Sequence, residues 1–484
     1  EIQHFVREDA VEATVIDIGE LPDLPEGLKS RGTPSDYHHS SGWTMEEYVQ
    51  AKENAARFTP ETLGGQEAVE SMIDAPTGPG VAFNALNAIS PAQGIQVPPD
   101  PIMAAGPGHL IGIVNSKFRV WDKTGTALIP ETTLDSFFSG VPNCGGSFDV
   151  FVDYDEANDR FVMGSMALIG DDSYLCLAAT KTGDPTTQWN TFSYRADGLD
   201  TSVSIDNPNM GIGLDAVYVT GTMFADGGGF SHVRIYAFDK DDLYNGTPLT
   251  AAEANVGGSY FGARVAKLHG YTSGGWPAPG TPHHIVARGV TSLTLGDMRI
   301  WRWINPFTES PSVYGTLGTV FLGIPPLAPE NGDLASSTNL NDTGDGKWWD
   351  AEYRGGYLWG VRNVACNFGG GDAESCVDWI RVDVSGVSPV LVEQQSGAAY
   401  GTTNQFRYYP DGSVDKNYNY AVGYTRSGWS DFAEVYVTGR LFGDAAGELQ
   451  AEVLQKSTTE NYTDGFGCGG TCDRWGDYTG MTID

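Results

Sequence analysis

The sequence predicts an all-β protein, a seven-bladed β-propeller that follows a partly helical N-terminal extension. Six apolar runs reach a glycine and continue as a strand, and each precedes a second strand that alternates apolar with polar residues. The anchoring glycines are Gly112, Gly164, Gly221, Gly289, Gly360 and Gly423. Their spacing of about 50 to 70 residues is that of a four-stranded blade with a variable loop.

Two further segments bear on how the ring closes. RWGDYTGMTID at 474–484 has the character of the first strand of a seventh blade, so the propeller is assigned to 79–484 with its last blade incomplete. VEATVIDIGEL at 11–21 has the β-branched alternation of a strand, and we expect it to cover a sheet edge. Within the same chain it would close the ring; in a neighbouring chain it would link subunits and support self-assembly.

The N-terminal extension, residues 1–78, differs in character from the rest of the chain. Thr44 and Glu47 make a capping box, and the apolar positions after them predict a helix over 45–58. A second short helix is predicted over 67–73. The remainder of the extension is polar and rich in turn residues, which is typical of loops.

Two insertions, 247–282 and 308–347, are predicted to be long loops because they are rich in Gly, Pro, Ser and Asn. Long loops on a rigid scaffold commonly carry binding specificity. Neither insertion contains a recognisable catalytic signature.

The charge balance excludes some partners and indicates others. The chain has 62 acidic and 28 basic residues, a net charge of −34, and no clustered basic face for nucleic acid. The acidity indicates a solvated surface, carboxylates that bind divalent cations, or both. No apolar run is long enough to cross a bilayer. The sequence begins at Glu1 with neither a methionine nor a basic-apolar leader, so we expect that a secretion signal has been removed and that the protein is secreted and extracellular.

Six cysteines predict three disulfides within the chain. Proximity pairs Cys366 with Cys376 and Cys468 with Cys472, which leaves Cys144 for Cys176. An even number of cysteines in loops and at strand ends favours an oxidising compartment. A zinc site is the alternative, but CGGTC supplies only two ligands and no companion motif lies near it in the sequence.

Aspartates near the starts of the innermost strands are candidate calcium ligands. The candidates are Asp100, Asp149, Asp350, Asp411 and Asp477. Carboxylates that converge on a propeller axis repel one another unless a cation lies between them, and calcium prefers such oxygen ligands. The alternative is that each aspartate caps its own turn.

A second calcium candidate is NDTGDGKWWDAE at 341–352. Its spacing matches a calcium-loop pattern in which Asp345 and Glu352 would be ligands. The flanking sequence predicts strand and loop rather than the helices of an EF-hand, so an ordinary Gly-Asp turn is the alternative.

Sugar chemistry requires a carboxylate pair, or a tyrosine with a basic partner, at the mouth of the channel. Candidate ligand-binding residues are Arg407, Tyr408, Tyr409, Arg474, Trp475 and the pair His283 and His284. Their spacing does not assemble them into one constellation, and each is also typical of a blade core or a strand start.

Five segments resemble a group of secreted bacterial β-propeller proteins that are sialidase-like in architecture and have no assigned activity. They are PPDPIMAAGPGHLIGIVNSKFRVWDKTG, VDYDEANDRFVM, LCLAATKTGDPTTQW, DAVYVTGTMF and DRWGDYTGMTID. The resemblance covers roughly residues 98–484 and implies a propeller. The aspartate box of sialidases is absent, which argues against sialidase activity.

Two functions are therefore open. The first is a non-catalytic secreted or cell-surface protein that binds a glycan or protein partner or serves in assembly, because no catalytic set is recognisable. The alternative is a glycan-active hydrolase or lyase at the channel mouth. A deep acidic pocket in which Tyr, His or Arg faces a carboxylate would favour the enzyme, and a filled channel would favour the binding protein.

Overall fold

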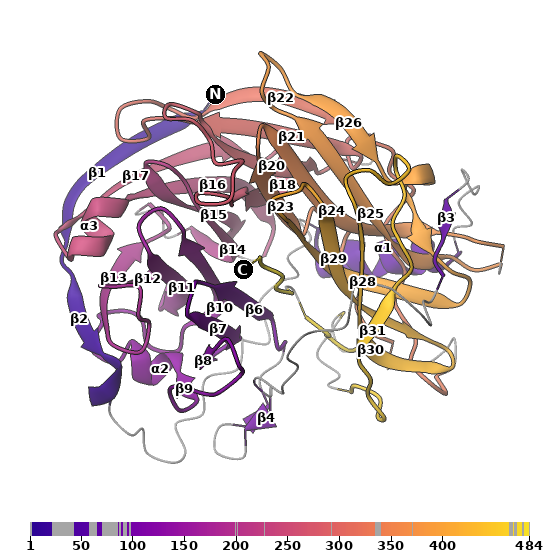
Figure 1. Cartoon of the computed structure of the whole chain (residues 1–484), viewed down its shortest axis with the longest axis horizontal. Helices are drawn as coiled ribbons and strands as arrows, with labels where there is room; N and C mark the ends of the chain where they lie inside the picture. Colours follow the sequence, from indigo (N-terminus) through magenta and orange to yellow (C-terminus); the bar gives the residue numbers. More distant parts are fainter. Residues whose placement is uncertain are drawn as a thin grey trace.

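Six antiparallel sheets of four or more strands make up the body of the protein and stand around a common centre (Figure 1). The computed structural model describes residues 2–21, 43–57, 65–69, 86, 89–90, 94–95 and 98–483, apart from gaps at 199, 201, 227, 292, 334–339, 370, 464–467, 469–471 and 477–478. No helix among these residues is long and apolar enough to cross a membrane.

The first three sheets follow one another along the chain. The first contains β6 (Pro101–Ala105), β7 (His109–Val114), β8 (Lys117–Asp122) and β9 (Thr132–Thr133). The second contains β10 (Phe148–Asp155), β11 (Arg160–Ile169), β12 (Asp172–Thr180) and β13 (Gln188–Arg195). The third contains β14 (Val203–Ile212), β15 (Ala216–Ala225), β16 (Phe230–Asp239) and β17 (Leu249–Gly257).

The last three sheets continue the same order. The fourth contains β18 (Tyr260–Val265), β20 (His283–Gly289), β21 (Asp297–Trp303) and β22 (Ser312–Gly318). The fifth is built on β23 (Asp350–Arg354), β24 (Tyr357–Cys366), β25 (Glu374–Asp383) and β26 (Val390–Gln394). The sixth contains β28 (Gln405–Val414), β29 (Tyr420–Gly428), β30 (Asp431–Arg440) and β31 (Val453–Lys456).

Short elements join or cap these sheets. In the fifth sheet, β19 (Lys267–Leu268) pairs in parallel with β23, and β27 (Tyr400–Gly401) pairs with β25 and with β3 (Gln66–Glu67). A separate hairpin is formed by β4 (Ile89–Ser90) and β5 (Gly94–Ile95). The short helices are α2 (Leu134–Phe137), α3 (Lys240–Asn245), and the single 3₁₀ turns η1 (Ile18–Glu20) and η2 (Ser396–Ala398).

The propeller arrangement is confirmed, whereas the prediction of seven blades is wrong, because only six sheets of this size form among the described residues. The described residues of 474–483 form no strand. Thr479 donates to the carbonyl of Tyr409 (2.7 Å), and the Met481 amide donates to Asp411 (2.6 Å). This segment is therefore held against the middle of β28 by isolated bonds rather than by a strand ladder.

Both insertions predicted as loops contain strands, so that prediction is wrong in part. Residues 247–282 contain β17, β18 and β19, and residues 308–347 contain β22. Glycines concealed these strands: Gly262 inside β18 has φ +62 at a register shift, a conformation in which other residues are strained.

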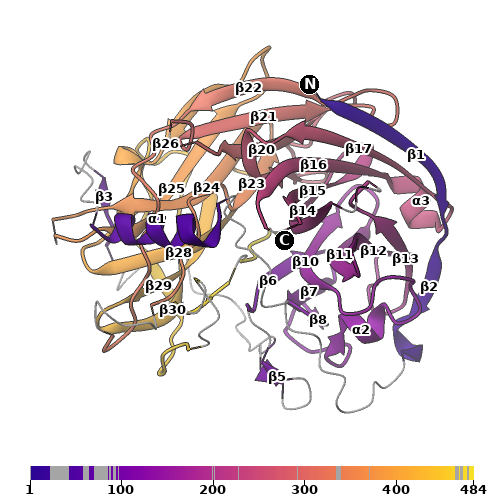
Figure 2. The same cartoon turned by 180° about the vertical axis from the view of Figure 1, so that it is seen from behind.

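The N-terminal extension packs along outer sheet edges, as predicted, but it does not close the ring. β1 (Gln3–Val11) pairs antiparallel with β17 and β2 (Thr14–Asp17) with β13, so these strands cover the outer edges of the third and second sheets. Figure 2 shows them as a belt along one side of the molecule. Linkage of neighbouring chains by this segment stays a prediction.

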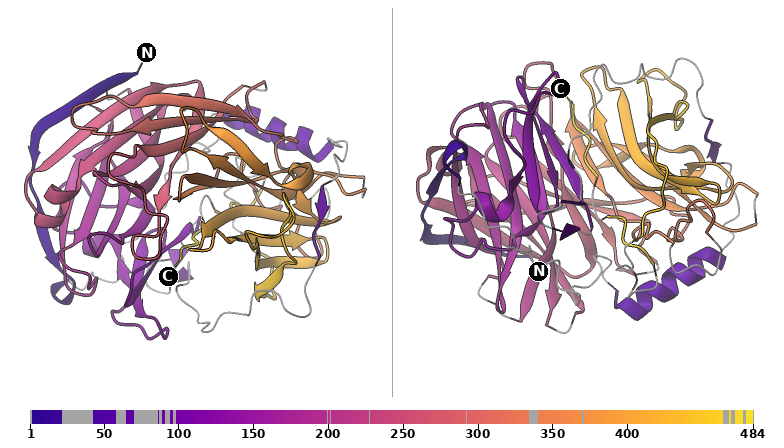
Figure 3. Two further views of the ribbon diagram at one scale, coloured as in Figure 1. Left: turned by 45° about the horizontal axis from the view of Figure 1, so that its top comes forward. Right: turned by 90° about the horizontal axis from the view of Figure 1, so that it is seen from below.

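The predicted helix is present as α1 (Met45–Arg57), and it lies across the side of the propeller that carries β24, β25 and β28 (Figure 3). Its capping box forms, because the Glu47 amide donates to Thr44 Oγ1 (3.2 Å) and the Thr44 amide donates to Glu47 Oε2 (2.9 Å). The prediction of a second helix over 67–73 is wrong at its first residue, because Glu67 belongs to β3. Residues 70–73 lie outside the described residues.

Apolar clusters seal neighbouring sheets to each other. Separate clusters of buried side chains join sheets one and two, two and three, three and four, four and five, and five and six. All three predicted disulfides are present, Cys144–Cys176, Cys366–Cys376 and Cys468–Cys472, and no cysteine is free. Such pairing is typical of oxidising compartments.

Candidate functional site

Charged side chains from three strands, β19, β23 and β28, meet at the centre of the propeller. Asp350 and Glu352 are two residues apart on β23, so they project from the same face of the strand. The short strand β19 runs parallel to β23 and sets Lys267 opposite Glu352. Asp411 on β28 interacts electrostatically with the same lysine. We call Lys267, His269, Asp350, Glu352 and Asp411 the axial cluster.

Lys267 is the cation that three of these carboxylates share. Its Nζ lies 2.9 Å from Asp350 Oδ1, and only 8% of the residue is exposed. Burial lowers the pKa of Lys267, but Asp350, Asp411 and Glu352 outweigh burial and raise it well above its ordinary value. Lys267 is therefore a permanent ammonium at neutral pH.

His269 lies between two glutamates. Its Nδ1 is 3.2 Å from Glu156 Oε1 and its Nε2 is 3.0 Å from Glu352 Oε2. Burial lowers the pKa of His269, yet Glu352 and Glu156 raise it to about 10, so the ring is an imidazolium at neutral pH.

The carboxyl groups around His269 differ in their pKa values. Burial raises the pKa of Glu352 to about 6, even though His269 opposes this, and burial raises the pKa of Asp153 on β10 to about 6 as well. For Glu156, burial acts in the same direction, but the bonds from His269, Tyr271 and Gly270 leave the pKa below its usual value. Near pH 6 the site therefore holds both protonated and ionised carboxyls, which acid–base chemistry requires.

Glu156 and the loop that it holds form the exposed end of this arrangement. The Glu156 side chain is 20% exposed and accepts bonds from the backbone amides of Gly270 (3.0 Å) and Tyr271 (2.8 Å). Tyr271 is 52% exposed, and its ring contacts that of Trp276 edge to face at 5.4 Å. Arg354 anchors the same loop by donating to Ser273 and Gly274. Exposed paired aromatic rings beside a carboxylate are a surface suited to a sugar ring.

The predicted axial aspartates fall into two groups. Asp350 and Asp411 belong to the axial cluster, whereas Asp100 and Asp149 belong to a relay of hydrogen bonds with Asn115 and Asn207. Arg264 donates to Asn207 and so extends this relay to the fourth sheet. Asp477 lies outside the described residues. Calcium at any of these positions stays a prediction.

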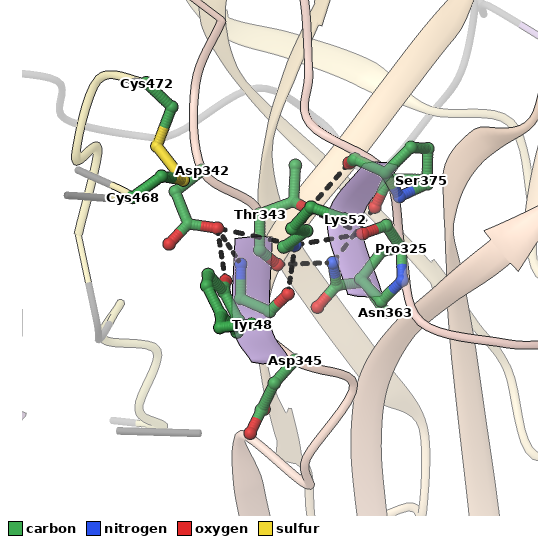
Figure 4. Close-up of polar contacts among 12 residues, drawn as sticks. Tyr48, Lys52, Pro325, Asp342, Thr343, Asp345, Asn363, Ser375, Cys468 and Cys472 are labelled. Atoms are coloured by element: carbon green, nitrogen blue, oxygen red, sulfur yellow. Dashed lines mark hydrogen bonds and ion pairs between the residues drawn. A yellow bond between two sulfur atoms is a disulfide. The ribbon is translucent and has the colours of Figure 1, made fainter. Parts of the chain in front are cut away.

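The oxygen-rich loop at 341–346 surrounds a cationic side chain from α1. Lys52 Nζ donates to Thr343 Oγ1 (2.7 Å), to the Pro325 carbonyl (2.9 Å) and to the Gly344 carbonyl, and it lies 3.4 Å from Asp342 Oδ1. Tyr48 donates to the same oxygen of Asp342 at 2.5 Å. Figure 4 shows both side chains of α1 directed into the loop. We call this the Lys52 cage.

Asp345 and Glu352 are placed in different surroundings. Asp345 accepts from Arg288 Nη2 (2.7 Å), and Glu352 faces His269. The sequence pattern at 341–346 thus identified a set of oxygen donors, and the cation that they contact in this structure is an ammonium. A calcium ion held jointly by Asp345 and Glu352 stays a prediction.

The predicted ligand-binding residues do not meet in one place. Arg407 is fully buried and pairs with Glu452 (2.7 and 2.9 Å) inside the sixth sheet. Tyr409 packs on Trp349 with ring centroids 4.9 Å apart. Trp475 donates to Thr425 and contacts Tyr408, and Arg474 precedes it.

The histidine pair has a structural role in the blade cores. His283 stacks on Tyr218 and His284 on Tyr353, with ring centroids 4.5 and 5.8 Å apart. Burial lowers their pKa values to about 3 and about 4, so both rings are neutral at physiological pH. Neither faces the axial cluster.

Three residues of the site were missed from the sequence: Glu156, Lys267 and His269. The available signal was KLH at 267–269, where alternate residues on an extended segment place both cationic groups on one face. Nothing in the sequence pairs that segment with Glu156, which lies 113 residues earlier in the chain.

The solved structures that resemble this chain do so at low similarity. No family model and no curated protein matches the chain. A polysaccharide lyase, an ulvan lyase, is 11% identical over 79% of this chain and 86% of its own, with a TM-score of 0.39. The Trypanosoma rangeli sialidase is 9% identical over 74% of this chain and 54% of its own, with a TM-score of 0.33. A Bacillus subtilis arabinanase is 13% identical over 60% and 96%, with a TM-score of 0.29.

Proposed function

We propose that this chain is an extracellular glycan-active enzyme whose site lies where Glu156 and the Tyr271–Trp276 surface meet the axial cluster. The observation that carries the proposal is His269 between two glutamates whose pKa values are displaced in opposite directions. Two titratable groups whose pKa values are shifted in opposite directions can supply an acid and a base to one reaction. Three disulfides and the absence of a free cysteine support an oxidising location.

Each group has a role in a glycosidic bond cleavage. Glu156, ionised and partly exposed, would act as the base, and Asp153 or Glu352, protonated below about pH 6, as the source of the proton. Tyr271 and Trp276 would position a sugar ring over Glu156. The net charge of −34 disfavours a polyanionic chain, so we propose a neutral glycan as substrate.

Release of reducing ends from a panel of neutral polysaccharides tests the proposal. Glu156→Gln and Glu352→Gln should each lower kcat/KM about 10²–10⁴-fold. Glu448→Gln, at an exposed glutamate, is the matched control and should leave the rate unchanged. The rate should fall as the pH rises above about 6, because the proton donors then ionise. Activity that survives both substitutions would contradict the proposed site.

A non-catalytic glycan-binding protein is the second candidate, and one observation favours it. The centre of the propeller is filled, since Glu352 has no exposed surface and His269 is 4% exposed. If affinity electrophoresis detects binding that Tyr271→Ala abolishes, while none of the panel is cleaved, the binding function holds and the enzyme proposal fails.

A further inference from the structure

An apolar cavity lies between the first and sixth sheets, and Glu156 is not among its lining residues. Its volume is about 430 Å³, within the range of small-molecule sites. Its walls are almost entirely apolar. Representative lining residues are Ile102, Leu110, Trp121, Val435, Val437 and Met481.

The position of the cavity follows from how the sheets pack. Every other pair of neighbouring sheets is sealed by a cluster of buried apolar side chains, and among the described residues no such cluster joins the sixth sheet to the first. Gly112 on β7 and Gly423 on β29 both line the cavity and place no side chain in it. A Cβ at Gly423 would lie 2.9 Å from Met481 Cε, so a larger residue there would reduce the space.

One charged residue, Asp411, is found among the described residues that line this cavity. Its Oδ2 accepts the Met481 amide at 2.6 Å, and its other close charges belong to the axial cluster. There, Asp350, Glu352 and Asp411 share Lys267, while His269 is also held by Glu156. Carboxyl groups therefore outnumber cationic side chains at this wall of the cavity.

Burial raises the pKa of Asp411 well above its usual value, and Asp350 adds to this while Lys267 opposes it. A carboxyl group in such surroundings gains from a cation brought close to it, because the low dielectric strengthens their attraction. Two tryptophans, Trp121 and Trp475, also line the cavity, and indole faces attract cations.

We infer that this cavity binds a small organic cation with an apolar body, its ammonium group directed to Asp411 and its body packed between Trp121, Leu110 and Val437. The charge of Asp411 selects the head group, and the apolar walls select the body. The site takes its walls from the first and sixth sheets and has only Asp411 in common with the axial cluster, and the inference does not depend on the proposed function.

Isothermal titration calorimetry with three probes of one shape tests this inference. Phenylbutylammonium should bind at least about tenfold more tightly than phenylbutanol, and phenylbutyrate most weakly. Asp411→Asn, which keeps an oxygen for the Met481 amide, should abolish the preference for the ammonium and leave phenylbutanol unaffected. An equal affinity of the wild-type protein for the ammonium and the alcohol, or no binding of either, would overturn the inference.

A second variant covers the case in which Asp411→Asn fails to fold. Val435→Phe places a ring at the cavity from a position that is 43% exposed, and it should weaken all the probes about tenfold or more. Val390→Phe, at a position 55% exposed on β26, is the matched control and should leave the affinities unchanged. Equal affinities in both variants would show that the probes bind elsewhere and would also overturn the inference.

Discussion

Two of the buried lysines, Lys52 and Lys267, have opposite pKa shifts because their surroundings differ. Lys52 lies in the Lys52 cage among two carbonyls, one hydroxyl and one carboxylate, and burial lowers its pKa because Asp342 compensates only in part. Lys267 faces three carboxylates, and its pKa is raised.

The opposite pKa shifts distinguish the Lys52 cage, which is a structural contact, from the axial cluster, which is part of the candidate site. The Lys52 cage offers its ammonium one carboxylate, that of Asp342, and its other oxygens are neutral carbonyls and a hydroxyl. The axial cluster has more carboxylates than cations, which is costly unless protons or a bound ligand compensate. Buried sites with more carboxyl groups than cations are common at functional sites, whereas side chains that only pack together rarely have such an excess.

The largest effect that we predict comes from removing the central cation. Lys267→Met should lower the free energy of unfolding by about 3–5 kcal/mol, because Asp350, Glu352 and Asp411 then lack their shared partner. The loss should be larger at pH 8 than at pH 5, where Glu352 and Asp411, whose pKa values burial raises, protonate. Urea titration at the two pH values measures it, with Lys416→Met at an exposed position as the control.

A smaller effect is expected at the Lys52 cage. Lys52→Met should cost about 2 kcal/mol, because the Pro325 and Gly344 carbonyls lose a buried donor. Hydrogen exchange of the amides of α1 should accelerate while that of β23 does not change. If β23 exchanges faster too, the two regions are coupled and the comparison between them is invalid.

The pH dependence of stability should differ in sign between the regions. The pKa of His269 is about 10 when folded, against 6.5 when unfolded, so its stabilisation is complete below pH 6.5 and is lost as the pH rises through 10. The pKa of Lys52 is lowered from 10.5, so the folded protein gains stability as the pH rises through that lowered pKa toward 10.5.

Melting temperatures from pH 6 to pH 10 check this prediction. In the His269→Gln variant, the melting temperature should fall less with rising pH than it does in the wild-type protein. In the Lys52→Met variant, the rise in melting temperature that deprotonation of Lys52 causes should be absent. Parallel curves for the wild-type protein and both variants would contradict the assignment of charge in either region.

The sequence predicts this fold well where the signal is local. In Asp297–Trp303, for example, buried Met298 and Ile300 alternate with the partly exposed Asp297 and Arg299, and that alternation depends only on which face is buried. The prediction of a strand over 474–484 was wrong because strand formation there depends on contacts distant in the sequence. RWGDYTGMTID alternates like a strand, but a strand needs a hydrogen-bonding neighbour, and that neighbour is set by distant packing.

The candidate site was less predictable for the same reason. Asp350 and Glu352 were found from one strand, whereas the imidazole that joins Glu352 to Glu156 comes from the residue after β19. That placement depends on a two-residue parallel pairing between β19 and β23, which has no sequence signature of its own. Tertiary contacts, not local propensity, bring these groups together.

The belt formed by β1 also affects the order in which the protein folds. Phe5 pairs with Glu253, a partner far along the chain, so β1 has no sheet to join until β17 has formed. Contacts of such long range form slowly, and meanwhile the edge of β17 is open to any extended chain nearby. β1 is synthesised long before β17 yet docks only after it, and the interval between is when the open edge of β17 is most exposed to aggregation.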